Sequence, residues 1–248
     1  MYKNYLFDLY GTIIDIHTNE DKPSLWQTLS LFMNLQGADY TAQELKAIYC
    51  QTIANSTKHI FGQKLSEKKE NTTPFELSEI EADLSLAIRN MYEMKGITPS
   101  DDQIADWALA MRTLSLEHIA LFDGAKDMLK TLKNQGKRIY LLSNAQRLFT
   151  EPEMRMLDIY NLFDDIFYSS DIGFKKPSWH FYNSLIEKYD LKQSETVMVG
   201  NDWIADAWGA ADYGIDSIYI HTEQSSEITG KLPENCRQIK QISEVSLF

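Results

Sequence analysis

The chain has 248 residues, of which 44% are hydrophobic and 24% are charged, a composition ordinary for a globular protein with a sizeable core. Its formal charge of −12 is opposite in sign to that of a general nucleic-acid-binding surface, and it also disfavours binding to anionic membranes. We therefore expect neither nucleic acid nor membrane as a partner, whereas a few local cations can still bind a small anionic substrate.

The two cysteines, Cys50 and Cys236, form neither a disulfide framework nor a zinc-binding pattern. No stretch approaches the roughly 20 apolar residues of a membrane span. The residues before Asp8 do not contain the apolar region of a signal peptide. These features predict a cytoplasmic protein with reduced thiols.

Residues 5–15 place a carboxylate directly after a short apolar run. The run 5–7 is typical of a strand buried on both faces, Asp8 follows it, and Gly11 marks a turn. Ligands of parallel α/β sheets bind beyond the carboxyl ends of the strands, so this pattern predicts Asp8 in a binding crevice. The alternative is that Asp8 caps a helix, because aspartate is a preferred N-cap residue.

Residues 16–118 are predicted to form successive amphipathic helices without a strand. The four helices are predicted to start at Pro23, at a capping box formed by Thr41 and Glu44, at residue 76, and at Ser100. The third helix is predicted to run to residue 95, and the polar segment 62–74 before it is predicted to be a loop.

From residue 123 onward the pattern changes to alternating helices and strands. Asp123 is predicted to cap a helix that ends at Gly136. The predicted strands are residues 138–142, 166–168, 196–199 and 217–220, and the helices between them include Met154, Pro177 and Trp203 near their starts. Strands separated by helices imply right-handed βαβ units and a parallel sheet.

The first strand needs these later strands as partners. One domain is therefore predicted from residues 1–15 and 119–248, and residues 16–118 form an all-helical domain inserted after the first strand. The predicted fold class is α/β, with a parallel-sheet core and this helical insertion.

Polar groups follow the predicted strands, where a parallel sheet places its binding residues. They are Asp8; Ser143 with Asn144; Lys176, which precedes Pro177; and Asn201 with Asp202 and Asp206. Each group alone has a structural explanation as a turn, a helix cap, a surface charge or a partner of a helix dipole. Their joint placement favours a functional site.

The chemistry of these residues suits a nucleophile, an anion-binding group and a divalent-metal site. Magnesium prefers oxygen ligands and is usually held by one or two carboxylates plus substrate phosphate. Asp202 and Asp206 are four residues apart and share a helix face. Lys176 nearby would neutralise charge on a transferred phosphoryl group and keep the carboxylates ionised.

This ordered set of motifs resembles that of the haloacid dehalogenase superfamily over nearly the whole chain. The matching motifs are residues 8–12 (DLYGT), Ser143-Asn144, Lys176-Pro177, and residues 200–202 with Asp206. The helical insertion resembles the C1-type helical cap of that family. The resemblance implies a Rossmann-like core, an aspartate nucleophile and, in most members, magnesium-dependent phosphoryl transfer.

The resemblance also implies a role for each matching residue. Asp8 would attack the substrate and form a covalent aspartyl intermediate. Lys176 would bridge Asp8 and the substrate anion, and Asp206 would orient Lys176 or a metal-bound water. The phosphate would be bound by Gly11, Thr12, Ser143 and Asn144, and Mg²⁺ would be held by Asp8, the backbone carbonyl of Tyr10, Asn201 and Asp202.

Two positions depart from the phosphatase pattern of the family. Tyr10 occupies the catalytic position of a second aspartate that acts as general acid and base, and a phenol with a pKa of ~10 is a poor base near neutrality. Asn201 stands where an acid commonly follows the glycine, and Asp202 could take its place after a small shift of the loop. Asp15 and His17 could replace the missing acid and base, or could simply be polar linker residues.

We therefore expect a Mg²⁺-dependent phosphatase that acts on a small phosphorylated metabolite through an aspartyl-phosphate intermediate. One alternative is a metal-independent 2-haloacid dehalogenase, since those enzymes resemble this chain in carrying tyrosine in a D-x-Y-G-T motif. Against it, the only arginines before residue 138 are Arg89 and Arg112, and neither lies early in the insertion to bind a haloacid carboxylate. The other alternative is a catalytically weak member that binds a ligand or a partner.

Overall fold

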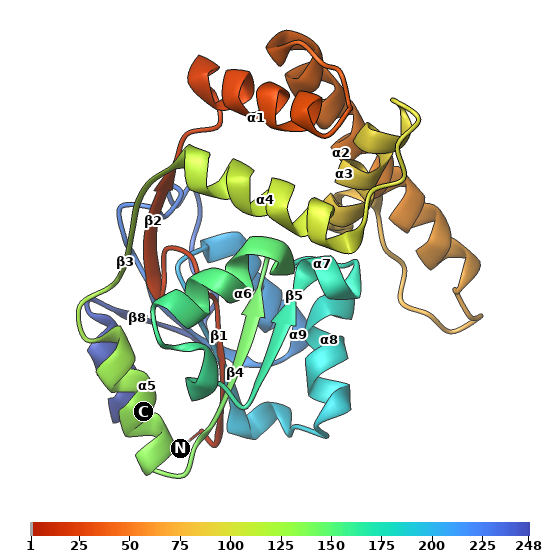
Figure 1. Ribbon diagram of the computed structural model, residues 1–248. Helices are drawn as coiled ribbons and strands as arrows, with labels where there is room; N and C mark the ends of the chain where they lie inside the picture. Colours follow the sequence, from red (N-terminus) through yellow and green to blue (C-terminus); the bar gives the residue numbers. More distant parts are fainter. Residues whose placement is uncertain (1) are drawn as a thin grey trace.

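The computed structural model describes residues 2–248, so Met1, at the start of the predicted core, lies outside the described residues. A parallel β-sheet with helices on both faces forms the core, and a group of helices lies beyond one end of it (Figure 1). This arrangement confirms the predicted α/β class with an inserted helical cap.

The core sheet has six strands in the order β5-β4-β1-β6-β7-β8. The strands are β1 (Asn4–Phe7), β4 (Arg138–Ser143), β5 (Asp165–Tyr168), β6 (Thr196–Gly200), β7 (Asp216–Ile220) and β8 (Cys236–Ile239). Every neighbouring pair is parallel. The five predicted strands are confirmed, whereas the edge strand β8 was not predicted from the sequence.

Strand β1 lies between β4 and β6 and is buried on both faces. Tyr5 and Phe7 contribute to one hydrophobic cluster, and Leu6, which points to the opposite face, contributes to another. All three side chains are fully buried. The uninterrupted apolar run at the start of the sequence therefore reflects a central strand covered on both sides.

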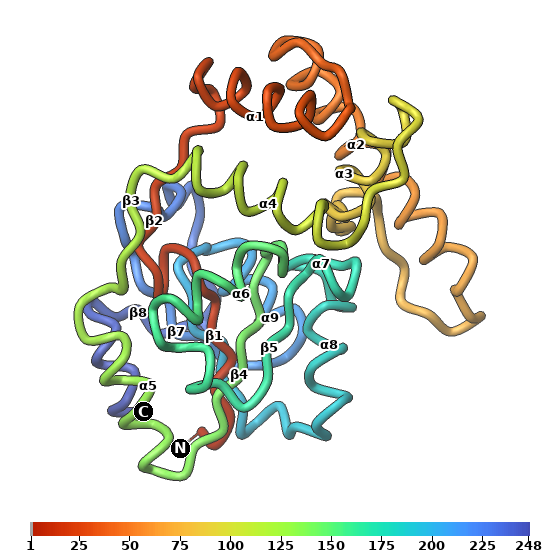
Figure 2. The backbone as a smooth tube through the Cα atoms, viewed as in Figure 1, coloured from red at the N-terminus to blue at the C-terminus, as the bar shows by residue number. Residues whose placement is uncertain are grey.

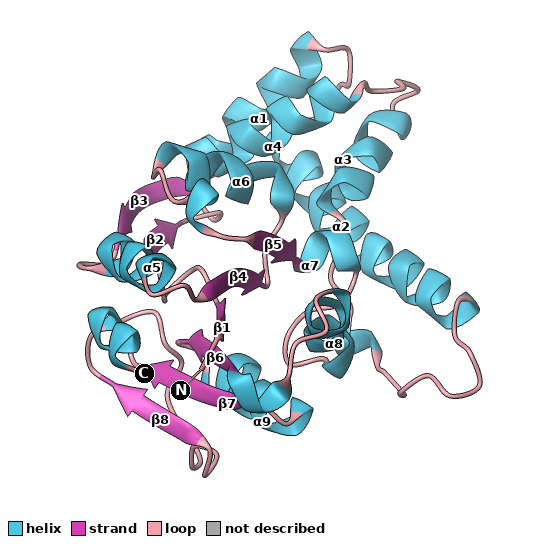
Figure 3. Cartoon of the chain, turned by 90° about the horizontal axis from the view of Figure 1, so that it is seen from below, coloured by secondary structure: helices cyan, strands magenta, loops and turns pink. Residues whose placement is uncertain are grey.

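Helices cover each face of the sheet (Figure 3). On the Tyr5 face lie α5 (Ala125–Asn134), α6 (Arg147–Met156) and the C-terminal 3-10 helix η5 (Ile242–Leu247). On the Leu6 face lie α8 (Trp179–Lys188) and α9 (Gly209–Tyr213). The short helices η2 (Tyr160–Leu162), α7 (Ser169–Ile172), η3 (Gln193–Glu195) and η4 (Trp203–Trp208) lie in the connections.

One predicted cap in the core differs from the structure. The helix after Asp123 begins at Ala125, and Gly124, with a φ of 80°, occupies the N-cap position. Asp123 was wrongly predicted as the cap, because the backbone turns one residue later in a left-handed conformation that glycine adopts readily.

The helical cap contains α1 (Pro23–Leu35), α2 (Ala42–Ser66), α3 (Leu84–Glu93) and α4 (Asp101–Ser115), with a 3-10 turn η1 (Leu77–Glu79) before α3. The predicted capping box of Thr41 with Glu44 is present, and so is the N-cap at Ser100. The cap helices enclose a hydrophobic cluster of their own, which includes Trp26 and Trp107.

The third predicted helix, residues 76–95, is wrong in its first half. Ile80 forms an antiparallel bridge with Phe174 of the core, and Asp83 caps the helix that starts at Leu84. A tertiary contact with the core therefore overrides the helical period of the sequence. The predicted loop 62–74 is also shorter than expected, because α2 continues to Ser66.

An antiparallel two-stranded ribbon joins the core to the cap (Figure 2). It consists of β2 (Ile14–Thr18) and β3 (Leu116–Leu121), so the prediction that residues 16–118 lack strands is wrong at both ends. Its outward side chains are exposed and it has only two strands, which leaves a weak strand signal in the sequence. The predicted domain boundaries, 15/16 and 118/119, fall inside these strands, and the division into domains stays a prediction.

Within residues 2–248, the helices are all too short or too polar to cross a lipid bilayer.

Because helices cover both faces of the sheet, we expect a buried and an exposed leucine to contribute very differently to the free energy of unfolding. Replacing the fully buried Leu141 of β4 in Leu141→Ala is expected to lower the free energy of unfolding by about 2–5 kcal/mol, because it leaves a cavity in the core. Leu31→Ala on α1, where the side chain is 58% exposed, is the control and is expected to change it by about 0.5 kcal/mol or less. Chemical denaturation measures both, and equal losses would contradict the assigned burial.

Candidate active site

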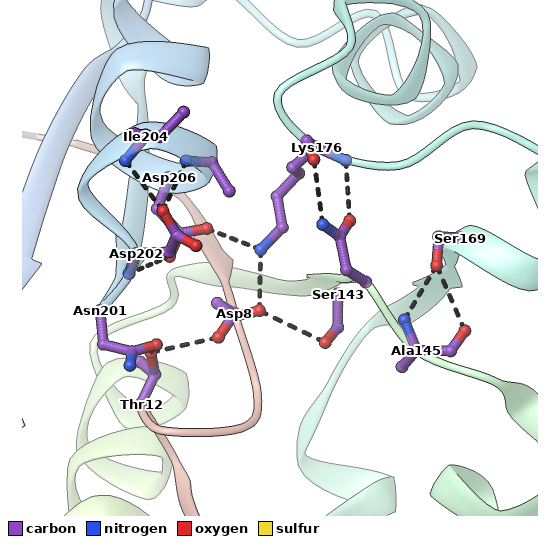
Figure 4. Close-up of polar contacts among 12 residues, drawn as sticks. Asp8, Thr12, Ser143, Ala145, Ser169, Lys176, Asn201, Asp202, Ile204 and Asp206 are labelled. Atoms are coloured by element: carbon purple, nitrogen blue, oxygen red, sulfur yellow. Dashed lines mark hydrogen bonds and ion pairs between the residues drawn. The ribbon is translucent and has the colours of Figure 1, made fainter. Parts of the chain in front are cut away.

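The predicted polar residues meet at the carboxyl ends of the central strands (Figure 4). Asp8 follows β1, Ser143 ends β4, Asn201 follows β6, and Lys176 lies between α7 and α8. They line a pocket of ≈ 250 Å³ together with Tyr10, Asn144, Asp202 and Asp206. Gly11 and Thr12 are buried in the loop that begins at Asp8. The structure thus brings together all the residues predicted from the four motifs.

The carboxylate of Asp8 is held by three side chains from different segments. Lys176 Nζ lies 2.7 Å from Asp8 Oδ1, and Ser143 Oγ donates to the same oxygen at 3.3 Å. Thr12 Oγ1 lies 3.3 Å from Asp8 Oδ2. Asp8 is 8% exposed, so its carboxylate is oriented by the protein while still reaching the pocket.

Lys176 is the central cation of the site. Its ammonium group also binds Asp206 Oδ1 at 2.6 Å, and both side chains are buried. Burial by itself lowers the pKa of Lys176, but Asp206 and Asp8 outweigh that effect, so the pKa is raised and the ammonium stays charged. Burial raises the pKa of Asp206 to about 7, against the opposing effect of Lys176.

Asn144 positions the main chain of Lys176. Its Oδ1 accepts from Lys176 N at 2.7 Å, and its Nδ2 donates to Lys176 O at 3.0 Å. These two bonds fix the loop from which the ammonium reaches Asp8. The side chain predicted to bind phosphate is therefore also the support of the neighbouring lysine.

Two glycines allow the loops to approach each other. Gly11 has a φ of 78°, and a Cβ there would come within 2.3 Å of Asn201 Nδ2. A Cβ on Gly200 would come within 2.1 Å of Asp206 Oδ2. Any side chain at either position would push apart residues that line the pocket.

Asn201 and Asp202 have different environments. Asn201 is buried, and its Oδ1 lies 3.2 Å from Thr12 Oγ1, the same hydroxyl that contacts Asp8. Asp202 is exposed, and its Oδ1 accepts from the main-chain N–H groups of Ile204 and Ala205 at 2.8 and 2.9 Å. Asp202 therefore caps the helix η4, which is the structural role that the sequence left open.

The hydroxyl of Tyr10 forms hydrogen bonds with two side chains of helix α6. It lies 2.5 Å from Glu153 Oε2 and 2.9 Å from Thr150 Oγ1. Burial and then the Glu153 carboxylate raise the pKa of the Tyr10 phenol far above its usual value. A phenol that already donates to a carboxylate is a poor base, in agreement with its intrinsic chemistry.

Glu153 in turn binds Arg112 of the cap. Arg112 Nε lies 2.5 Å from Glu153 Oε1, and the two side chains are 14% and 8% exposed. The guanidinium lies 5.3 Å from the centre of the Tyr10 ring and 4.4 Å from that of Phe149. Glu153 was not singled out from the sequence, and Arg112 was noted only as a rare arginine.

Asp15 and His17, the alternative acid and base predicted in the linker, do not line the Asp8 pocket, although Gln224, which binds Asp15, does. Asp15 accepts from Gln224 Nε2 at 2.6 Å and lies 3.4 and 3.2 Å from the Nε2 atoms of His17 and His118. It lines a different cavity from the one that contains Asp8.

A loop near the C-terminus completes the pocket. Gln224 and Ser226 contribute to its lining, and Thr222 Oγ1 donates to Gly11 O at 2.9 Å. Asn201 Nδ2 donates to Ser225 Oγ at 3.4 Å. The sequence contains no motif in residues 222–226 that could have predicted this contact.

The oxygen atoms near Asp8 are suitable ligands for a hard cation. Asp8 Oδ2 and Asn201 Oδ1 both lie within 3.3 Å of the Thr12 hydroxyl, so a carboxylate oxygen and an amide oxygen contact the same group. Oxygen ligands of these types fit Mg²⁺. Among the described residues, no three His, Cys, Asp or Glu side chains are grouped to hold a metal, so a ligand set here needs amide and carbonyl oxygens.

Similarity to known proteins extends over most of the chain. The model of the haloacid dehalogenase-like hydrolase family matches residues 2–214. Glyceraldehyde 3-phosphate phosphatase of Methanothermobacter thermautotrophicus is 27% identical over 56% of this chain and 63% of its own length, so the alignment spans less than two thirds of that relative.

Solved structures are also similar. The hydrolase YfnB of Bacillus subtilis, whose crystal structure is described as bound to magnesium, has a TM-score of 0.54 and 21% identity, covering 98% of this chain and 96% of that one. A dehalogenase crystal structure has a TM-score of 0.53 and 16% identity, covering 98% and 95%. At these identities the similarity shows the fold alone.

The match over most of the chain and the four motifs at one sheet edge define a hydrolase of the Rossmann-like type with a helical cap. The chain belongs to the haloacid dehalogenase-like hydrolase family.

The buried ion pairs predict a strong effect of removing Lys176. In Lys176→Met the carboxylates of Asp8 and Asp206 lose their cation, and the free energy of unfolding at pH 8 is expected to fall by about 3–5 kcal/mol. Without the lysine the pKa of Asp206 rises further above its unfolded value. The loss of stability from Asp206 is therefore complete above the raised pKa of the folded protein. It is smaller at pH 5, where the Asp206 carboxyl of the folded protein is protonated.

Lys188→Met is the control, because Lys188 forms an exposed pair with Asp165. It is expected to change the free energy of unfolding by about 1 kcal/mol or less. Urea denaturation at both pH values measures these effects, and a Lys176→Met protein as stable as the wild type would rule out the assigned ion pairs.

Proposed function

We propose that this protein is a Mg²⁺-dependent phosphatase that hydrolyses a small phosphorylated metabolite through an aspartyl-phosphate intermediate. The observation that carries the proposal is the Asp8 carboxylate, which is oriented by Lys176 and Ser143 and lines a pocket with other polar side chains. Membership of the hydrolase family and similarity to a protein named as a phosphatase support it.

Asp8 is the nucleophile of the proposed reaction. Its carboxylate attacks the phosphorus atom, the bond to the leaving-group oxygen breaks, that oxygen takes a proton from solvent water, and the phosphoryl group becomes bonded to Asp8. Water then attacks the phosphorus and releases phosphate and the free carboxylate. Lys176 holds Asp8 in place, and its charge stabilises the negative charge on the transferred group.

The loops after β1 and β4 bind the phosphate. Ser143 and Asn144 provide the side-chain donors, while the N–H groups of Gly11 and Thr12 donate to Ile14 O and Leu9 O and hold the loop in shape. Asp206 keeps Lys176 in position, since its Oδ1 lies 2.6 Å from the ammonium group.

Asp8, the backbone carbonyl of Tyr10, Asn201 and Asp202 would hold Mg²⁺. When bound, the ion supplies positive charge that neutralises the phosphate oxygens. The oxygens of Asp8 and Asn201 that contact the Thr12 hydroxyl support this assignment, and the magnesium described for the YfnB structure is in keeping with it.

Activity measurements test the proposal directly. The wild type is expected to hydrolyse p-nitrophenyl phosphate only with Mg²⁺, and Asp8→Asn is expected to reduce kcat by about 10³-fold or more because the nucleophile is lost. Asp102→Asn, a change at an exposed aspartate of the cap, is the control and should retain the activity. Chloride release from 2-chloropropionate that is insensitive to a chelator would instead identify a dehalogenase.

The position of Tyr10 generates a separate prediction. Its hydroxyl donates a hydrogen bond to Glu153 and has a raised pKa, so we expect it to take no part in proton transfer. Tyr10→Phe should then lower kcat by less than about tenfold, whereas loss of a general acid costs about 10²–10⁴-fold.

Tyr10→Asp tests the same point in the opposite direction. A carboxylic acid at this position is expected to raise kcat for an alkyl phosphate more than for p-nitrophenyl phosphate, because alkoxide leaving groups need a proton. If Tyr10→Phe abolishes turnover of alkyl phosphates and spares p-nitrophenyl phosphate, the phenol is the acid and this assignment is wrong.

A further inference from the structure

A second cavity adjoins the Asp8 pocket between the core and the cap. It has a volume of ≈ 300 Å³ and shares Tyr10 and Asn144 with the pocket of ≈ 250 Å³ that contains Asp8. Its walls come from strand β2, the segment 144–146 after β4, Glu81, and one residue each of the cap helix α4 and the core helix α6, which pack against each other (Figure 1). The leaving group of a phosphate ester bound at Asp8 can therefore extend into this second cavity.

The cavity has an unusual balance of charge. Among the residues that line it, all of them described, Arg112 is the one cationic side chain, and Glu81 is the one anionic side chain. Glu153 lies behind Arg112 and binds its guanidinium through Nε at 2.5 Å and Nη2 at 3.4 Å. The positive charge of Arg112 is thus balanced before any ligand arrives, and Glu81 leaves the cavity net negative.

The remaining polar groups of the cavity are oriented by the protein. Glu81 Oε2 accepts from Ser169 Oγ at 2.7 Å, and Glu81 Oε1 accepts from Gln146 Nε2 at 3.2 Å. Gln146 Nε2 also donates to Ala82 O at 2.8 Å, so both side chains are held in place. Carboxylate and amide oxygens in fixed positions suit hydroxyl donors of a ligand.

We infer that the leaving group of the substrate is uncharged and carries hydroxyl groups, as in a polyol or sugar phosphate, and that Glu153 is a specificity-determining residue because it neutralises Arg112. A ligand with a second anionic group, such as a phosphorylated carboxylic acid or a bisphosphate, meets Glu81 without a free cation to offset the repulsion. The inference rests on the proposed phosphatase activity and adds the substrate class to it.

A matched pair of substrates tests the inference. Glycerol 3-phosphate and 3-phosphoglycerate have the same carbon chain and differ in a hydroxymethyl group against a carboxylate. The wild type is expected to favour glycerol 3-phosphate by about tenfold or more in kcat/KM, because only the carboxylate is repelled by Glu81.

Glu153→Gln should shift that preference. With its partner neutral, Arg112 is free to bind a carboxylate, and the ratio of the two kcat/KM values is expected to move about tenfold towards 3-phosphoglycerate, mainly through its KM. Glu151→Gln is the matched control, since it removes the same charge from the same helix at a residue bound to Arg147 and Arg155. The ratio should not change in that variant.

Glu81→Gln gives an independent result if Glu153→Gln does not fold. It leaves the pair of Arg112 with Glu153 intact and should also move the ratio towards 3-phosphoglycerate. A wild type that prefers 3-phosphoglycerate, or folded variants whose ratio equals that of the wild type, would overturn the inference.

The same measurements separate this inference from the proposed function. If the wild type hydrolyses p-nitrophenyl phosphate with Mg²⁺ but fails the substrate comparison, only the substrate class is wrong. If it does not hydrolyse p-nitrophenyl phosphate or either phosphate ester, the phosphatase proposal is refuted and the substrate class with it.

Discussion

The ammonium group of Lys176 lies between two buried carboxylates, and the geometry of the site depends on that contact. Its charge compensates Asp8 and Asp206, which would otherwise be costly to bury as anions. Because Asn144 binds the main chain of Lys176 and Asp206 accepts from Asp202 N, one connected set of bonds joins the loops after β1, β4, α7 and β6. Movement of any one loop would therefore disturb the other three.

Close approach of the backbone is the second requirement. The absence of a side chain at Gly11 makes room for Asn201, and its absence at Gly200 makes room for Asp206. Charge attraction alone could not bring these groups together if a Cβ stood between them. The two glycines and the lysine thus act together, one kind of residue providing the space and the other the attraction.

Much of the fold and of the site could be predicted because both leave local patterns in the sequence. Asp8 and Asn201 each follow an apolar run, and parallel strands place such residues at one edge. The partner of Tyr10 could not be predicted, because Glu153 is one of many acidic residues and its contact with Arg112 forms only when the cap packs on the core. The ribbon of β2 and β3 was missed for a related reason, since its two strands are far apart in the chain.

The position of β1 in the middle of the sheet also affects when the core can fold during synthesis. Asn4 bonds to Thr196 and Arg138, which follow it by 192 and 134 residues. During synthesis the first strand, apolar on both faces, must wait until residue 200 of 248 has been made before both neighbours exist, and such distant pairing is slow. Asp8 therefore enters its final surroundings only when β6, its loop and residues 222–226 have been translated, and no shorter N-terminal fragment can contain a formed site.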